Sequence, residues 1–208
     1  MDGPTKKAIG IVVLAAGAAR RMNTPKQLLR FEGRSLVRRA AETAVSSAYA
    51  PIVVVLGAHF DETRRELAGF PIEIVRNEEW AAGLSSSIRI GIENLLRIEP
   101  QIAAAMITLA DQPFVEADKI NLFAEKYRSS ENLIVAASYR ATTGVPALFA
   151  RELFGELARL SGDRGAKALI EKHRGRLSTI DLPEAAVDID TPEDYRKLLS
   201  HEQTRARH

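Results

Sequence analysis

Four short apolar runs limit most strongly how this chain can fold. None of them alternates polar with apolar residues, as a strand with one wet face would, so each indicates a strand that is covered on both faces. Segments with a helical pattern separate the runs, and parallel strands need crossover connections of that kind. The pattern therefore predicts a single three-layer α/β domain with a mostly parallel sheet. The runs are AIGIVVLA, PIVVVLG, AAAMITLA and LIVAAS, which begin at residues 8, 51, 103 and 133.

Three helices can be placed from the same pattern. The first is expected over residues 36–48, because its apolar side chains form one stripe. The second is expected in the segment GLSSSIRIGIENLLRI, whose serines at 85–87 suit an N-terminal cap. The last begins in DIDTPEDYRKLL, after a short strand. There Thr191 is the expected N-cap, Pro192 stands at the first helical position, and Asp194 comes close to completing a capping box.

The chain of 208 residues is long enough for one substantial core. We expect a domain over residues 8–200, with flexible ends at 1–7 and 201–208. No apolar run approaches the roughly 20 residues needed to span a bilayer, so no membrane segment is expected. The N-terminus lacks the cleavage pattern of a signal peptide, which makes the cytoplasm the expected location.

The composition excludes several kinds of chemistry. There are no cysteines, which removes disulfides, thiolate metal sites and a cysteine nucleophile. The four histidines show no zinc-ligand spacing. With 29 basic and 27 acidic residues the formal charge is only +2, so a surface that binds nucleic acid is not expected.

A run of small residues follows the first predicted strand, which ends at Leu14. Residues 15–19, AAGAA, would let backbone N–H groups approach an anion closely, as in a phosphate cradle. The stretch has neither the G-x-x-x-x-G-K-[ST] pattern of a P-loop nor the G-x-G-x-x-G pattern of a dinucleotide site. Arg21 and Lys26 follow as candidate cations for the phosphates. The alternative interpretation is a basic loop exposed to solvent.

Three acidic residues are candidates for a metal site. Asp111 follows the third apolar run, at the edge where open α/β sheets bind ligands. Mg²⁺ is commonly held by one or two carboxylates together with substrate phosphate oxygens, so Asp111 is the first candidate ligand. Asp188 and Asp190 are two apart on a predicted strand and would share a face, and Asp188 is the preferred second ligand. The alternatives are that Asp111 only closes a turn and that Asp190 serves the turn and the helix cap.

The serines at 85–87 have two interpretations. Their hydroxyls could read the edge of a base, and the exposed N–H groups of the helix start would favour negative charge. Capping of the helix explains the same serines almost as well.

Several segments together resemble a known family. The stretch LAAGAARRMNTPKQLL is similar to the signature of MobA-like nucleotidyltransferases, and most closely to that of molybdenum cofactor cytidylyltransferases. The resemblance extends from about Ile9 to Leu199 and implies a Rossmann-like nucleotidyltransferase fold. Its further matches, in the family's order, are GLSSSIRIGI, LADQPFV, GVPALF, GDRGAKALI and DIDTPEDY.

The resemblance also implies roles for the matched residues. Asp163 and Arg164 would lie on the acceptor side, where a surface turn before a helix is the alternative. The catalytic residues would be Arg21, Lys26 and Asp111, with Asp111 and Asp188 as the metal ligands. The residues implied to bind the nucleotide are Leu14, Ala15, Ala16, Gly17, Arg21, Lys26, Ser85, Ser86 and Ser87.

This sequence departs from the family's usual pattern at three positions. Ala19 stands where serine is common, and Asn23 stands where glycine follows the methionine. Neither change disables a loop that works through its backbone, because asparagine tolerates left-handed backbone geometry. Val145 replaces the histidine of a Gly-His-Pro segment, which leaves the identity of the acceptor open.

The resemblance implies transfer of CMP from CTP to the terminal phosphate of molybdopterin or molybdenum cofactor, with Mg²⁺ and release of pyrophosphate. LAAG, TPK and LADQP favour cytidine over guanosine, since the guanylyl branch usually reads LAGG, an Asp-Lys pair and Cys-Asp-x-Pro. The alternatives are a GTP-dependent guanylyltransferase, a nucleotidyltransferase that acts on a sugar or polyol phosphate, and a non-catalytic protein that delivers the cofactor. A less specific alternative is a chaperone-like interaction domain. The partner that the resemblance implies is a molybdoenzyme or its chaperone.

Overall fold

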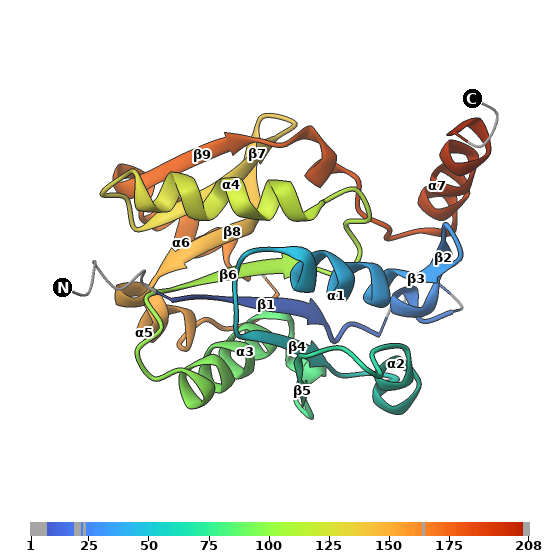
Figure 1. Ribbon diagram of the computed structural model, residues 1–208, viewed down its shortest axis with the longest axis horizontal. Helices are drawn as coiled ribbons and strands as arrows, with labels where there is room; N and C mark the ends of the chain where they lie inside the picture. Colours follow the sequence, from blue (N-terminus) through green and yellow to red (C-terminus); the bar gives the residue numbers. More distant parts are fainter. Residues whose placement is uncertain (1–7, 19–21, 23, 164, 206–208) are drawn as a thin grey trace.

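The computed structural model describes residues 8–18, 22, 24–163 and 165–205, with side chains as far as residue 200. Its centre is a seven-stranded sheet in the order β5-β4-β1-β6-β8-β7-β9 (Figure 1). Only β8 runs against the others, because it pairs antiparallel with both β6 and β7. The predicted α/β fold with a mostly parallel sheet is therefore confirmed. The strands of this sheet are β1 (Ile9–Ala15), β4 (Ile52–Leu56), β5 (Glu73–Arg76), β6 (Ala104–Leu109), β7 (Ile134–Tyr139), β8 (Thr142–Ala150) and β9 (Leu177–Asp181).

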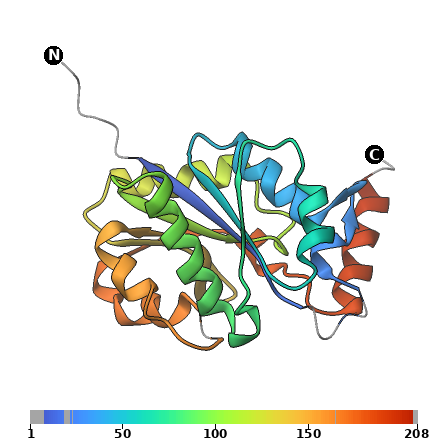
Figure 2. The same ribbon diagram turned by 90° about the horizontal axis from the view of Figure 1, so that it is seen from below.

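Helices cover both faces of the sheet and give the three layers (Figure 2). Successive side chains of β1 point to opposite faces: Ile11 joins the core under α1 and α4, whereas Val12 joins the core under α3, α5 and α6. Both cores are continuous apolar clusters, which explains why the central strands read as unbroken apolar runs. The α-helices are α1 (Leu36–Ser46), α2 (Phe60–Glu66), α3 (Leu84–Ile98), α4 (Ala117–Arg128), α5 (Phe154–Leu157), α6 (Lys167–Lys172) and α7 (Pro192–Arg205).

A third, smaller core joins the two ends of the chain. A short hairpin of β2 (Arg30–Phe31) and β3 (Arg34–Ser35) packs beside α7, and Tyr195 donates its hydroxyl hydrogen to Arg30 O at 2.8 Å. The buried side chains of this core are Met22, Leu29, Phe31, Leu36, Ile189 and Leu198. It therefore braces the segment that follows β1 against the segment that precedes α7.

Single-turn 3-10 helices complete the chain. They are η1 (Lys26–Leu28), η2 (Trp80–Ala82), η3 (Arg151–Leu153), η4 (Arg174–Arg176) and η5 (Pro183–Ala186). Within the described ranges, no helix is both long and apolar enough to cross a membrane.

The structure corrects two local predictions and confirms a third. The strand expected at residues 188–190 is wrong, because this segment is irregular and the last strand, β9, ends earlier. The first helix ends at Ser46, two residues before the predicted end. The capping box at Thr191 and Asp194 is confirmed, since each residue accepts a hydrogen bond from the backbone N–H of the other. α7 continues past residue 200, and the flexible tail from 201 stays a prediction.

Candidate active site

A pocket of about 480 Å³ opens at the carboxyl ends of β1 and β6. Open parallel sheets bind ligands at this edge, and the volume is that of a small-molecule site. β1 and the bend after it supply Leu14, Ala15, Ala16, Gly17 and Ala18 to the wall. Other walls come from η1, from η2 with the start of α3, and from segments near residues 111, 163 and 188–190. The predicted bend and the predicted carboxylates therefore meet at one cavity.

Gln27 holds the bend after β1 in place. Its side chain is buried, and its Nε2 atom donates to Ala15 O at 3.0 Å and also to Gly17 O. These contacts fix two carbonyls of the bend to the turn that carries Lys26. Sequence reasoning missed Gln27. Its only sequence signal is its position directly after the Pro-Lys pair, and that position does not reveal its contacts with the bend.

Gly57, just after β4, allows the bend and η2 to lie close together. A Cβ at this position would lie 2.6 Å from Ala16 O and 2.6 Å from the Cβ of Trp80. Only glycine fits such an approach without a shift of the backbone. Trp80 is half-buried and lines the pocket, although the sequence analysis did not single it out.

Lys26 lies between two carboxylates at the edge of the pocket. Its Nζ atom donates to Asp111 Oδ2 and to Asp190 Oδ1, the latter at 3.0 Å. Burial by itself would lower the pKa of Lys26, but Asp111 and then Asp190 outweigh it and raise the pKa above its ordinary value. Lys26 is therefore a charged ammonium at neutral pH. Its contacts join η1 to the loop after β6 and to the segment before α7.

Asp188 lies at the rim of the same pocket. Partial burial and the nearby carboxylates of Asp190 and Asp111 raise the pKa of Asp188, which Lys26 only partly offsets. No described residue forms an ion pair with Asp188, whereas Lys26 pairs with both other aspartates. The three carboxylates thus carry more negative charge than Lys26 neutralises.

Asp111 has the feature expected of a metal ligand. Its Oδ1 atom is buried and has no hydrogen-bond partner among the described residues, while Oδ2 contacts Lys26. An unpaired carboxylate oxygen beside a pocket suits a hard divalent cation. In the described part of the chain, no group of three or more acidic, histidine or cysteine side chains could hold a metal ion. A cation bound at Asp111 would therefore need oxygens from the ligand, which is how Mg²⁺ is usually bound.

The three serines do not cap α3, which corrects that prediction. The helix begins at Leu84, its N-cap is Gly83, and all three serines are buried in its first turn. Ser86 Oγ donates to Gly83 O at 2.8 Å, with Glu79 O also within reach at 3.1 Å. Ser87 lines the pocket, and Ser85 and Ser86 do not.

The loop at residues 162–163 lies against the start of α3. Ser85 donates its backbone N–H to Gly162 O at 3.2 Å, and a Cβ on Gly83 would lie 2.5 Å from Asp163 Oδ1. Asp163 lines the pocket, and its acceptor-side role stays a prediction. Arg164, Arg21, Ala19 and Asn23 lie outside the described residues.

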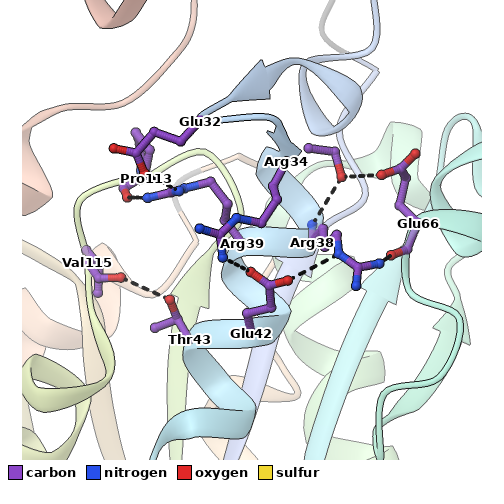
Figure 3. A network of polar contacts seen from close by, with 10 residues as sticks. Glu32, Arg34, Arg38, Arg39, Glu42, Thr43, Glu66, Pro113 and Val115 are labelled. Carbon is purple, nitrogen blue, oxygen red and sulfur yellow. Dashed lines mark hydrogen bonds and ion pairs between the residues drawn. The ribbon is translucent and has the colours of Figure 1, made fainter. Parts of the chain in front are cut away.

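A polar network around α1 fixes the loop after Asp111 (Figure 3). Arg39 of α1 donates to Pro113 O at 3.4 Å and to Glu32 at 2.7 Å. Its guanidinium also stacks on Phe31, with the guanidinium carbon 4.7 Å from the ring centre. Thr43 Oγ1 reaches Val115 O at 3.5 Å. α1 therefore joins the β2–β3 hairpin to the loop that carries the predicted metal ligand.

These features define a class of protein: α/β domains that bind a ligand at the carboxyl edge of a mostly parallel sheet. The family model that matches the chain is the MobA-like NTP transferase domain, over residues 11–177, and the chain belongs to this family. The resemblance found in the sequence is thereby confirmed. The protein is a nucleotidyltransferase of the MobA-like family.

Relatives at about 30% identity extend over nearly the whole chain. Nicotine blue oxidoreductase from Paenarthrobacter nicotinovorans is 30% identical over 199 residues, which are 90% of this chain and 95% of the relative. The crystal structure of Rv0371c from Mycobacterium tuberculosis H37Rv is 30% identical, with a TM-score of 0.78, and covers 93% of this chain and 99% of the other. A crystal structure of Rv0371c in complex with manganese gives 28% identity and a TM-score of 0.75, with 93% and 98% covered.

Proposed function

We propose that this chain transfers CMP from CTP to the terminal phosphate of a molybdopterin-type cofactor, in the cytoplasm. The observation that carries the proposal is the meeting of Lys26, Asp111 and Asp190 at a pocket bordered by the bend after β1. A phosphate oxygen of the acceptor attacks the α-phosphorus of CTP. One P–O bond forms, the bond to the β-phosphate breaks, and pyrophosphate leaves.

The proposed chemistry needs no nucleophilic side chain, because a phosphate monoester is already an anion near neutral pH. Catalysis then rests on alignment and on neutralisation of charge. Backbone groups from Leu14 to Gly17 hold the nucleotide, and Arg21 and Lys26 bind its phosphates. For Lys26 this role requires that its ammonium leave at least one carboxylate and turn toward the phosphates.

We propose Asp111 as the principal ligand of a divalent cation and Asp188 as the second. The unpaired Oδ1 atom of Asp111 supports the first assignment. Asp188 lacks an ion pair with any described residue and faces two other carboxylates, so a cation would relieve that repulsion. The bound cation, Mg²⁺ or Mn²⁺, would neutralise charge on the leaving pyrophosphate. The manganese complex of Rv0371c is consistent with this.

The choice of base and acceptor rests on the sequence. LAAG, TPK and LADQP favour cytidine, and Ser87 is the serine in position to read the base. Asp163 and Arg164 are assigned to the acceptor. Val145 packs against the apolar core between the sheet and α3, so this position supplies no imidazole to the acceptor.

A second candidate function follows from one relative. The name of nicotine blue oxidoreductase describes a redox enzyme, and that protein matches 90% of this chain. An oxidoreductase of this fold would need a redox cofactor in the same pocket. The third candidate is a protein that carries the nucleotide or cofactor without turnover. The cationic and acidic groups gathered at one edge of the pocket argue against it, because ligand binding alone does not need all of them.

Measurement of pyrophosphate release separates these candidates. Purified protein is mixed with MgCl₂ and with CTP, GTP, ATP or UTP in turn, with and without molybdenum cofactor. We expect release with CTP that depends on both the acceptor and the metal, and that EDTA abolishes. Release with a sugar phosphate instead would change the acceptor. If no nucleotide and acceptor together release pyrophosphate, and the protein instead promotes oxidation of NADPH, the redox function replaces the proposal.

A further inference from the structure

Asn77 is fully buried between β5 and η2, and the proposed chemistry gives it no role. Its Oδ1 atom accepts the backbone N–H of Glu79 at 2.9 Å. The Nδ2 atom donates to Ser86 Oγ and to Ser87 Oγ, both at 2.9 Å. Because a backbone N–H can only donate, the amide oxygen must face Glu79 and the amide nitrogen must face the serines. The orientation of this side chain is therefore fixed by its contacts.

That orientation also fixes the two serine hydroxyls. Each hydroxyl accepts a hydrogen bond from Asn77, so each has one hydrogen left to donate. The hydrogen of Ser86 goes to Gly83 O, within the first turn of α3. The Ser87 hydroxyl has no described acceptor for its hydrogen, and Ser87 lines the pocket. Ser87 thus keeps its hydrogen available to donate to a ligand in the pocket.

The surroundings of Ser87 suit a base more than a phosphate. Trp80, Leu84 and Gly83 line the pocket on the side of η2 and α3 and are uncharged. The one described charged group beside them is the carboxylate of Asp163, which lies against Gly83 and would repel a phosphate. Lys26 and its carboxylates come from other parts of the wall, namely η1, the loop after β6 and the segment before α7. A neutral donor on a wall that carries no described cation matches an acceptor atom on the edge of a nucleobase, such as a ring carbonyl.

We propose that Asn77 is a positioning residue that holds the Ser87 hydroxyl and leaves its hydrogen free to donate to an acceptor atom on the nucleobase. This inference rests on the proposed function, because it requires a nucleotide in the pocket. Asn77 does not touch the ligand, and it acts by occupying an acceptor position of the Ser87 hydroxyl.

Replacement of Asn77 by aspartate tests this polarity. Asn77→Asp keeps the shape and the acceptor for Glu79, but its second oxygen accepts from Ser87 and draws the hydroxyl hydrogen away from the pocket. We expect CTP affinity, measured by calorimetry with Mg²⁺, to fall about 10-fold, as for loss of one hydrogen bond. Ser87→Ala should lose a similar factor. In the double variant the two losses should not add, because they remove one interaction.

The chain offers a matched control at a second asparagine–serine pair. Asn132 Nδ2 donates to Ser178 Oγ at 2.7 Å beside β7 and β9, and neither residue lines the pocket. Asn132→Asp makes the same chemical change and should leave CTP affinity within about twofold. Thermal melting of all variants shows which are folded.

The outcomes separate this inference from the proposed function. If the unchanged protein binds none of the four nucleotides, the proposed function fails. If it binds CTP and folded Asn77→Asp binds as tightly, the inference is overturned while the function stands. Additive losses in the double variant would also overturn it. If Asn77→Asp does not fold, Ser87→Ala decides: unchanged CTP affinity overturns the inference, and a tenfold loss supports it.

Discussion

Replacement of Lys26 by methionine tests the centre of the proposed site. The methionine keeps the length and apolar stem of the side chain and removes only the charge. In the free protein this charge bridges Asp111 and Asp190, whose side chains are 13% and 47% exposed. The variant therefore leaves the aspartates of the pocket without their shared cation. Lys126→Met on α4, an exposed lysine outside the pocket, is the matched control.

The expected loss of rate is large and the expected loss of stability is moderate. A preorganised donor at a reacting phosphate contributes about 3–4 kcal/mol, which corresponds to a decrease of roughly 10²–10³-fold in kcat. A fully buried pair that loses one partner costs about 3–5 kcal/mol, and an exposed pair costs about 0–1 kcal/mol. Lys26 is 20% exposed, so we expect an intermediate loss of about 1–3 kcal/mol.

Two assays measure these quantities on the same protein samples. Pyrophosphate release with saturating CTP, metal and acceptor gives kcat, and urea unfolding at pH 7 without ligands gives the free energy of unfolding. Lys126→Met should change kcat less than about twofold. A folded Lys26→Met variant that keeps kcat within about threefold would refute the assignment of Lys26 to the phosphates, whatever its stability.

Three further changes test the framework of the site. Gly57→Ala places a Cβ 2.6 Å from the backbone of the bend, so calorimetry should show CTP affinity about 10-fold weaker, whereas Gly175→Ala, with open space around its Cβ, should leave it unchanged. Burial and two nearby carboxylates raise the pKa of Asp188, so its charge costs stability above that pKa. Asp188→Asn should therefore stabilise the protein in urea at pH 7, and the gain should disappear as the pH falls toward about 4; a gain independent of pH would contradict this. Arg39→Met removes a ring contact and two hydrogen bonds, so urea unfolding should show a loss of about 1–2 kcal/mol in the free energy of unfolding. The control Arg34→Met, at a half-exposed side chain, should lose less than about 0.5 kcal/mol.

The central strands could be predicted from the sequence because both of their faces are buried. β1, β4, β6 and β7 correspond to the four apolar runs. β5 and β9 lie at the edges of the sheet, and their side chains are half-buried or exposed, so their sequences, EIVR and LSTID, carry little apolar signal. β8 contains Pro146, which normally argues against a strand. A register shift in β7 between Ala136 and Ala137 accommodates this part of β8.

The site could be predicted only where a residue belongs to a local motif. Lys26 and Asp111 stand in short, recognisable stretches, and the structure brings them into contact across 85 positions of the sequence. Gln27 and Asn77 could not be found in this way, because Gln27 binds two carbonyls of the bend and Asn77 binds two serine hydroxyls of α3, and only the fold places these groups within reach. The start of α3 shows the same limit: Gly83 is the N-cap because the 162–163 loop leaves no room for a side chain there, and three serines nearby do not change that.

The charges of the pocket determine what kind of ligand can enter it. The charged side chains that line it in the described ranges are Lys26, Asp111, Asp163, Asp188 and Asp190, one cation against four carboxylates. A bare triphosphate would meet net repulsion from these groups, since like charges at short range cost free energy. Two of the predicted cations, Arg21 and Arg164, would still not outnumber the carboxylates. A divalent cation carried by the triphosphate changes the sign of this interaction, because Asp111 and Asp188 then become its ligands. In the proposed function the metal is therefore a condition for nucleotide binding as well as for chemistry, and Lys26 keeps the carboxylates in place until the metal arrives.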